Sequence, residues 1–127
     1  MTLEEKQRLA LKFLSILGRP AADVVKEVAV EDMIWTFPGS SVISGEAHGI
    51  KAILKRAQTI ARHKVSVEIV RTIYGFSGVA VILHNTAEEN GKVLDEHLAA
   101  VFAFRGHKIE RLDTHLSDVA MVEAFFG

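Results

Sequence analysis

The sequence predicts an α+β domain in which helices come first and an antiparallel sheet follows. Apolar residues recur at helical spacing near the N-terminus, and the pattern changes to a period of two from Lys64 onward. Asn90-Gly91 is in addition a strong signal for a two-residue hairpin turn. The 127 residues suit one domain, 1–127, with enough chain to bury a real core.

The first two helices are predicted from the residues at their ends. Thr2 stands three residues before Glu5, which is a capping-box pattern, and the apolar face that follows stops at Gly18. Pro20 suits the first position of a second, short helix over residues 21–29. Both helices are therefore expected before any strand.

A strand and a third helix should follow them. The segment MIWTF, residues 33–37, is predicted to be a strand that is broken at Pro38. Side chains two apart on a strand share a face, so Trp35 and Phe37 should point the same way. Helical periodicity then returns over residues 47–61.

The remaining chain has the pattern of an antiparallel meander with a closing helix. The predicted strands cover residues 65–73, 79–89, 92–104 and 108–116. The helix covers residues 117–126, with Ser117 or Asp118 as its N-cap.

The central hairpin assigns each of its side chains to a face. If Asn90-Gly91 is the turn, opposed residue numbers sum to 181, and Asn85 then faces Glu96. The helices should cover the bulkier apolar face, because burying a large apolar side chain contributes about 1.5–3 kcal/mol. That face carries Leu83, Asn85, Glu96, Leu98, Ala100, Phe102 and Phe104. The outer face carries Ile82, His84, His97, Ala99, Val101 and Ala103.

The register of the last hairpin decides which polar side chain enters the interior. A two-residue turn at residues 106–107 would place Asp113 beside Ala100, whereas a turn one residue longer would exchange the faces. We favour the longer turn, because it buries two leucines and spares three ionisable groups the cost of unpaired burial. The residues expected inside are then Leu112, Thr114 and Leu116, and those outside are Arg111, Asp113 and His115.

The composition narrows the classes of function. The formal net charge is −1 and there is no cysteine, so nothing favours a nucleic-acid partner, and cysteine chemistry is excluded. No stretch approaches the ~20 apolar residues of a membrane span, and the charged N-terminus lacks the apolar run of a signal peptide. We therefore expect a cytoplasmic protein without membrane or nucleic-acid partners.

Three motifs carry a family resemblance: WTFPG at residues 35–39, SGEAHGIKAIL at 44–54 and FRGHKIERLDTHLSD at 104–118. In this order they resemble the SnoaL-like branch of the nuclear transport factor 2-like superfamily, which includes ketosteroid isomerases, limonene epoxide hydrolases and polyketide cyclases. The resemblance implies a cone-shaped, cystatin-like fold in which a curved antiparallel sheet wraps around the N-terminal helices. It also implies an apolar pocket at the open end, and often a homodimer through the back of the sheet.

The functional residues of two of these groups are not matched in this chain. Where ketosteroid isomerases carry their base and the two donors of their oxyanion hole, the matching positions are Phe37, Phe13 and Ala100. Where limonene epoxide hydrolases carry their Arg-x-Asp pair and their last aspartate, the matching positions are Val81, Leu83 and Thr114. The first set cannot move a proton or donate a hydrogen bond to an enolate, so neither activity is expected to transfer directly.

Two pairs of residues remain as candidates for acid–base catalysis. Asn85 and Glu96 should face the pocket, where apolar walls disfavour a charged carboxyl group, as a general acid or base requires. The alternative is that both are solvated at the open rim, since they lie near the hairpin end. Asp113 and His115 share a strand face and form the second pair, an orienting acid and a base.

Four outer residues raise the question of a metal site. His84, His97, Asp113 and His115 could together bind zinc or a similar ion through neutral imidazoles. We favour a polar patch or a dimer interface, because no compact ligand motif such as HExxH occurs. Neither a metal nor a cofactor is therefore predicted.

The expected partner is a small apolar organic molecule. Its pocket should be lined by Phe13, Trp35, Phe37, Leu83, Leu98, Ala100, Phe102, Leu112 and Thr114, although these residues also suit a filled core. The Trp35 indole N–H would be a polar handle for the ligand. The predicted function is a SnoaL-like isomerase, cyclase or hydrolase, and the alternative is a non-catalytic ligand-binding or dimeric interaction module. A homodimer is expected through the partly apolar outer face.

Overall fold

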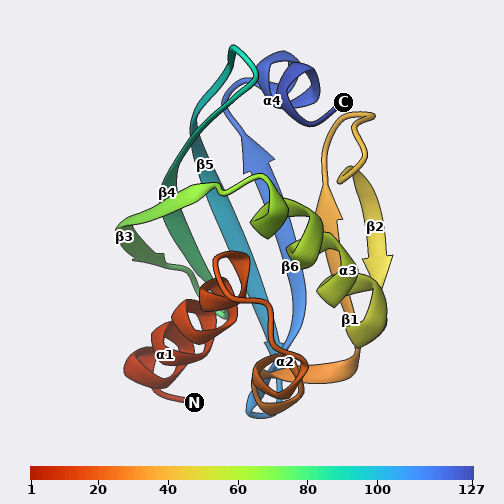
Figure 1. The fold of residues 1–127 in the computed structure, drawn as a ribbon. Coiled ribbons are helices and arrows are strands. Elements are labelled where there is room, and N and C mark those ends of the chain that lie inside the picture. The colour runs from red at the N-terminus through yellow and green to blue at the C-terminus, as the bar shows by residue number, and fades with distance from the viewer.

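The computed structural model describes residues 1–127 as a six-stranded curved sheet with helices on one face (Figure 1). The helices are α1 (Leu3–Leu14), a 3-10 turn (Ser15–Leu17), α2 (Ala22–Val28), α3 (Gly49–Arg62) and α4 (Val119–Phe126). The strands are β1 (Ala29–Phe37), β2 (Gly45–His48), β3 (Ser66–Tyr74), β4 (Val79–Glu89), β5 (Lys92–Arg105) and β6 (Lys108–Leu116). The predicted α+β class is confirmed.

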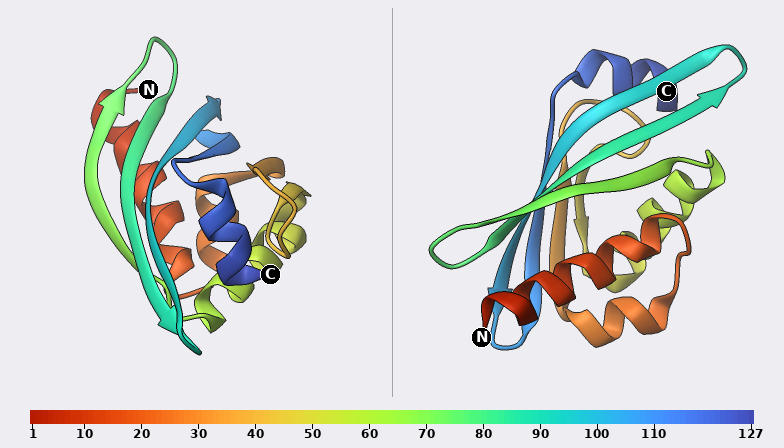
Figure 2. Two further views of the ribbon diagram at one scale, coloured as in Figure 1. Left: turned by 90° about the horizontal axis from the view of Figure 1, so that it is seen from above. Right: turned by 90° about the vertical axis from the view of Figure 1, so that its left-hand side faces the viewer.

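The strand order in the sheet is β2-β1-β6-β5-β4-β3. Strands β3 to β6 form the expected antiparallel meander. Strand β1 joins β6 in parallel, and the short β2 pairs with β1; neither pairing is predicted from the sequence. Helices α1, α2 and α3 lie inside the curve of the sheet, and no helix covers its outer face (Figure 2). No helix is long and apolar enough to cross a membrane.

Helix ends follow the residues that cap them. The Glu5 backbone N–H donates to the Thr2 hydroxyl over 3.1 Å, which satisfies one of the free donors of the first turn of α1. At the start of α4, Asp118 rather than Ser117 is the N-cap, and its carboxylate accepts from the Met121 N–H over 3.0 Å. Pro20 differs from the expectation, because it precedes the first residue of α2 by two positions.

The central hairpin has the predicted register throughout. Asn90 and Gly91 adopt φ of 53° and 79°, as a type I′ turn requires, and Glu89 pairs with Lys92. Asn85 consequently lies opposite Glu96, and His84 opposite His97.

The last hairpin reaches the favoured register by a different route. Its turn has only two residues, since Arg105 pairs directly with Lys108. The register then shifts between Ala103 and Phe104, where β6 contains one extra residue, Glu110. This bulge brings Thr114 opposite Ala100. The prediction that Thr114 faces inward is confirmed, and the predicted longer turn is wrong.

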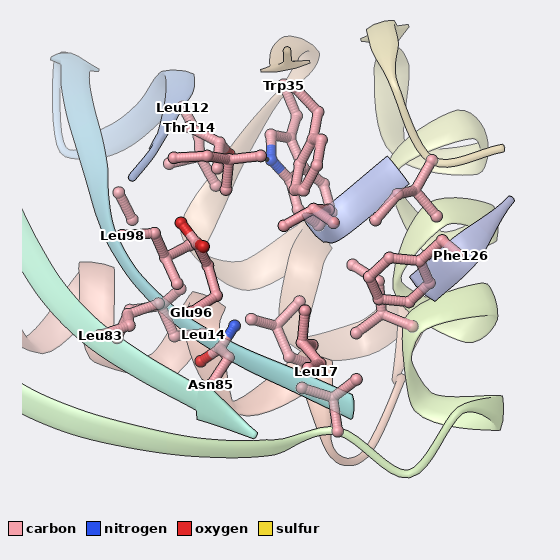
Figure 3. A pocket seen from close by; sticks show the side chains of 18 residues that line it. Leu14, Leu17, Trp35, Leu83, Asn85, Glu96, Leu98, Leu112, Thr114 and Phe126 are labelled. Carbon is pink, nitrogen blue, oxygen red and sulfur yellow. Dashed lines mark hydrogen bonds between the residues drawn. The ribbon is translucent and has the colours of Figure 1, made fainter. Parts of the chain in front are cut away.

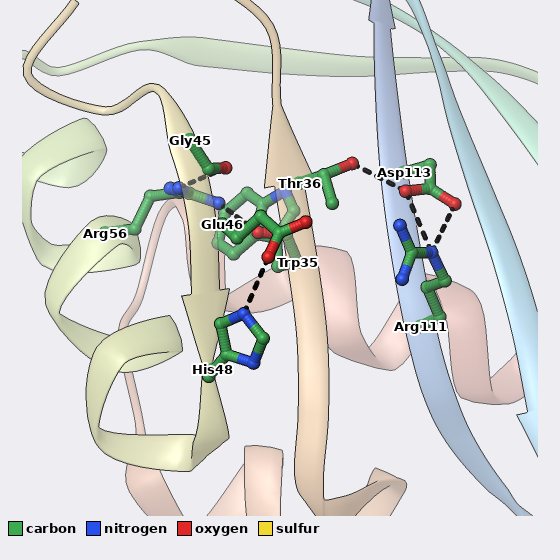
Figure 4. A network of polar contacts seen from close by, with 8 residues as sticks. All are labelled: Trp35, Thr36, Gly45, Glu46, His48, Arg56, Arg111 and Asp113. Carbon is green, nitrogen blue, oxygen red and sulfur yellow. Dashed lines mark hydrogen bonds and ion pairs between the residues drawn. The ribbon is translucent and has the colours of Figure 1, made fainter.

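Arg56 on α3 ties the first two strands together. Its Nη1 donates to the Trp35 carbonyl of β1 over 2.6 Å, and its Nη2 donates to the Gly45 carbonyl of β2 over 2.9 Å (Figure 4). The guanidinium lies 5.0 Å from the centre of the Trp35 ring, which permits a cation–π contact. Burial lowers the pKa of Arg56 to about 10, so the side chain stays charged at neutral pH.

The change Arg56→Met should lower the free energy of unfolding by about 2–4 kcal/mol, because two backbone carbonyls lose their donors in a buried setting. Urea denaturation followed by the fluorescence of Trp35, the only tryptophan, measures this loss. Arg62→Met, at the exposed end of the same helix, is the control and should change stability by less than about 0.5 kcal/mol. Equal losses from both variants would contradict the role given to Arg56.

Candidate functional site

A cavity lies between the concave face of the sheet and helix α4 (Figure 3). Fifteen of its eighteen lining residues are hydrophobic, and about 40 Å³ of space is free inside it. The three polar lining residues are Asn85 on β4, Glu96 on β5 and Thr114 on β6. These polar groups therefore come from three neighbouring strands of an otherwise apolar wall.

Seven of the nine residues predicted to bind ligand are part of this wall. They are Trp35, Phe37, Leu83, Leu98, Ala100, Leu112 and Thr114. The other two, Phe13 and Phe102, are fully buried in the core. The Phe13 ring packs edge-on against Trp35 at 5.7 Å and against Phe102 at 5.9 Å. These contacts fill the space around the two phenylalanines, so neither lines the cavity, contrary to the prediction.

Nine further lining residues are absent from the predicted set. They are Leu14, Leu17, Ile43, Ile60, Val65, Leu94, Leu116, Val122 and Phe126. Several belong to helix ends and loops, whose position against the sheet depends on the complete fold. The four-residue spacing of Val122 and Phe126 places both on one face of α4, and this spacing is the signal that could have identified the helix as a wall.

Glu96 is held against the start of α4, and its side chain is only 1% exposed. Its Oε1 accepts from the Ser117 N–H over 2.5 Å, from the Ser117 hydroxyl over 3.0 Å and from the Asp118 N–H over 3.3 Å. These donors include backbone N–H groups at the helix N-terminus, a favourable position for a carboxylate. Glu96 is therefore not solvated at a rim.

The second carboxylate oxygen of Glu96 has no partner. Glu96 Oε2 and the amide oxygen Oδ1 of its cross-strand neighbour Asn85 are both buried without a hydrogen bond. A buried acceptor left unpaired costs about 1–3 kcal/mol. Because both residues line the cavity, a bound molecule with donor groups can satisfy them, and Glu96 Oε2 can also accept a proton.

The indole of Trp35 is already engaged. Its Nε1–H donates to the Thr114 hydroxyl over 2.9 Å in a buried setting. The indole N–H, expected as a polar handle for a ligand, is thus bonded within the protein in this structure. The polar group that Trp35 and Thr114 together offer the cavity is the hydroxyl of Thr114.

Asp113 and His115 lie on the outer face and do not line the cavity. Asp113 accepts from the Arg111 Nε over 2.8 Å and from the Thr36 hydroxyl over 2.6 Å. Partial burial raises the pKa of Asp113, but the bonds from Arg111 and Thr36 outweigh it and hold the pKa below its usual value. Asp113 is thus an ion-paired carboxylate of the sheet surface, and His115 is exposed beside it.

The four residues considered for a metal site do not form one group. Only His84 and His97 lie together, and the carboxylate that joins them is Asp95. Asp113 is paired with Arg111 instead. Asp95 joins the two histidines because it stands two positions before His97 on β5, so both side chains lie on the same face of the sheet.

Comparisons with known proteins bear on the fold alone. No family model matches the sequence, and no curated protein matches it. Among solved structures, Bal32a from a soil-derived mobile gene cassette has a TM-score of 0.89 at 22% identity, with 98% of each chain covered. An NTF2-like protein from Burkholderia xenovorans has a TM-score of 0.81 at 18% identity, with 98% of each chain covered.

A third structure, a candidate SnoaL-like polyketide cyclase from Jannaschia sp., has a TM-score of 0.79 at 12% identity. The match covers 98% of this chain and 93% of that one. The chain therefore has the nuclear transport factor 2-like, cystatin-like fold that the resemblance implied. Different activities occur on this one fold, so the activity has to be argued from the site.

Thr114→Val keeps the volume of the side chain and removes the acceptor of the Trp35 indole. The free energy of unfolding should fall by about 1–3 kcal/mol, because the N–H is left unpaired in a buried setting. Urea denaturation measures the change. The control is Thr86→Val, at a partly exposed position of β4, which should change the free energy of unfolding by less than about 0.5 kcal/mol. An unchanged stability of Thr114→Val would contradict this pairing.

Proposed function

We propose that the protein binds a small, largely apolar organic molecule in the cavity and moves a proton on it with Glu96. The observation that carries the proposal is the state of this carboxylate. One oxygen is fixed by three donors, and the other is buried, unpaired and part of an apolar wall. A positioned carboxylate in such surroundings suits general acid–base catalysis.

The chemistry that fits best is proton transfer at a carbon next to a carbonyl group. The fixed Oε1 would orient the carboxylate, and Oε2 would take the proton and return it to the ligand. Asn85 and Thr114 would contribute the polar contacts that orient the ligand. One neighbour in structure is a candidate isomerase from Rhodopseudomonas palustris, with a TM-score of 0.75 at 17% identity, which is compatible with this class of reaction.

The size of the cavity limits how a ligand enters. The free space of about 40 Å³ is much smaller than the ~300–1,000 Å³ of typical ligand sites. A ligand larger than a few atoms would therefore have to displace wall side chains. Phe126 on α4 is only partly buried, so its side chain can move aside more readily than the fully buried residues of the wall.

The rival function is ligand binding without catalysis. It is favoured by the positions Phe37 and Ala100, where ketosteroid isomerases would carry acids. Under this alternative, Glu96 would serve to hold α4 and to accept a hydrogen bond from the ligand. The two functions differ in whether a bound ketone loses a proton.

Deuterium exchange distinguishes proton transfer by Glu96 from binding without catalysis. Small cyclic ketones are incubated with the protein in D₂O, and deuterium uptake beside the carbonyl is followed by NMR. The parent protein should accelerate uptake, and Glu96→Gln should lower the rate by about 10²–10⁴-fold, because Gln keeps the Oε1 acceptor for α4 and loses the base. Asp113→Asn, on the outer face, should leave the rate unchanged.

Two results would contradict the proposal in different ways. If the ketones quench Trp35 fluorescence but exchange no faster than in buffer, the protein is a binder. If Asp113→Asn abolishes exchange while Glu96→Gln does not, the outer pair with His115 is the catalytic one.

We also propose that two copies of the chain associate through the outer face, where Ile82, Ala99, Val101 and Ala103 form a partly apolar strip that no helix covers.

Val101→Glu should shift the protein from dimer to monomer, since a charge would be buried without a partner. Sedimentation at micromolar concentration measures the shift. Val42→Glu, on an exposed loop, is the control. A parent protein that sediments as a 14.0 kDa particle would refute the dimer.

A further inference from the structure

The outer face of the sheet carries a row of imidazole and carboxylate groups that the cavity does not use. Glu68 on β3 pairs with His84 on β4, and His84 pairs with His97 on β5. Asp95 stands two residues before His97 and therefore shares its face. One ligand atom each from His84, Asp95 and His97 lie within 4.8 Å of one another.

We propose that His84, Asp95 and His97 bind a divalent transition-metal ion, with Zn²⁺ as the best fit. Two neutral imidazoles and a carboxylate, with water in the fourth position, are a common zinc ligand set. Around a tetrahedral Zn²⁺ the ligand atoms stand roughly 3.3 Å apart, given bond lengths of about 2.0–2.1 Å. The three atoms lie within 4.8 Å of one another, so side-chain rotation alone would bring them to that spacing. Mg²⁺ and Ca²⁺ prefer oxygen ligands and are not expected to bind here.

His84 has a carboxylate on each side, which orients its ring for metal binding. Its Nε2 lies 2.5 Å from Asp95 Oδ1, and its Nδ1 lies 3.5 Å from Glu68 Oε1. Histidine ligands usually donate the other ring N–H to a carboxylate, which fixes the tautomer and strengthens the ligating nitrogen. Glu68 is placed to accept from Nδ1, while the ion would replace the proton between Nε2 and Asp95.

The two imidazole rings are stacked on the outer face of the sheet. The His84 and His97 rings are nearly parallel, at 5°, with centroids 4.2 Å apart. His97 is exposed, and rotation of its ring alone would turn one nitrogen toward an ion held between His84 Nε2 and Asp95.

The test is a titration of metal-free protein with Zn²⁺, followed by calorimetry. We expect saturable binding of one ion per chain, with no comparable binding of Mg²⁺ or Ca²⁺. His84→Gln, His97→Gln and Asp95→Asn should each weaken Zn²⁺ binding by about 100-fold or more, since each removes one of three ligands. Glu68→Gln should weaken it by roughly tenfold, as the loss of an outer carboxylate does.

His48→Gln is the matched control. His48 Nε2 lies 2.8 Å from Glu46 Oε1, so this exposed pair has a histidine and a carboxylate but no second imidazole (Figure 4). Its loss should leave Zn²⁺ binding unchanged. The absence of saturable Zn²⁺ binding, or an equal loss from His48→Gln and His84→Gln, would overturn the proposal.

Co²⁺ provides a readout that needs no variant. Bound by two imidazoles and a carboxylate, Co²⁺ in the parent protein should give a visible spectrum distinct from that of the aqueous ion. A spectrum identical to that of aqueous Co²⁺ would overturn the proposal even if a variant failed to fold.

Discussion

The register between β5 and β6 decides which side chains face the cavity, and the rest of the site depends on it. The bulge at Glu110 brings Thr114 opposite Ala100 and turns Asp113 outward to Arg111. Without this extra residue, Asp113 would stand in the apolar wall, and the alternating leucines of β6 would face solvent. An unpaired carboxylate in such a wall costs several kcal/mol, so burial rather than turn length selects the register.

The same register also places hydrogen-bond donors beside the buried carboxylate of Glu96. Strand β6 leads directly into α4, so the position of Thr114 also fixes where Ser117 and Asp118 present their N–H groups. Those groups lie against Glu96 Oε1 and compensate part of its desolvation. Glu96 can therefore be buried because the start of α4 donates hydrogen bonds to it. Asp113 lies on the outer face, where it pairs with Arg111.

Local signals account for the parts of the fold that the sequence predicts. The turn at Asn90-Gly91 needs positive φ at two successive residues, and this requirement alone sets every pair of the β4–β5 hairpin. The parallel pairing of β1 with β6 joins segments far apart in the chain and has no local signal. The sequence also carries no local signal for the bulge, because Glu110 is a residue type that occurs in ordinary strands. The pairing of Asn85 with Glu96 follows from the local turn and is predicted correctly. The contact of Glu96 with α4 depends on the whole fold and is not predicted.

The unpaired oxygens of Glu96 and Asn85 are the strongest argument that the cavity is more than a packing defect. A carboxylate that served only to cap α4 would be equally useful with its second oxygen in water. In a core without function, an apolar side chain at position 85 would also be more stable than a buried amide with an unpaired oxygen. A molecule that brings donor groups into the cavity recovers the energy that both acceptors lose on folding. Ligands with a donor should therefore bind better than equally large ligands without one, whether or not a proton is then transferred.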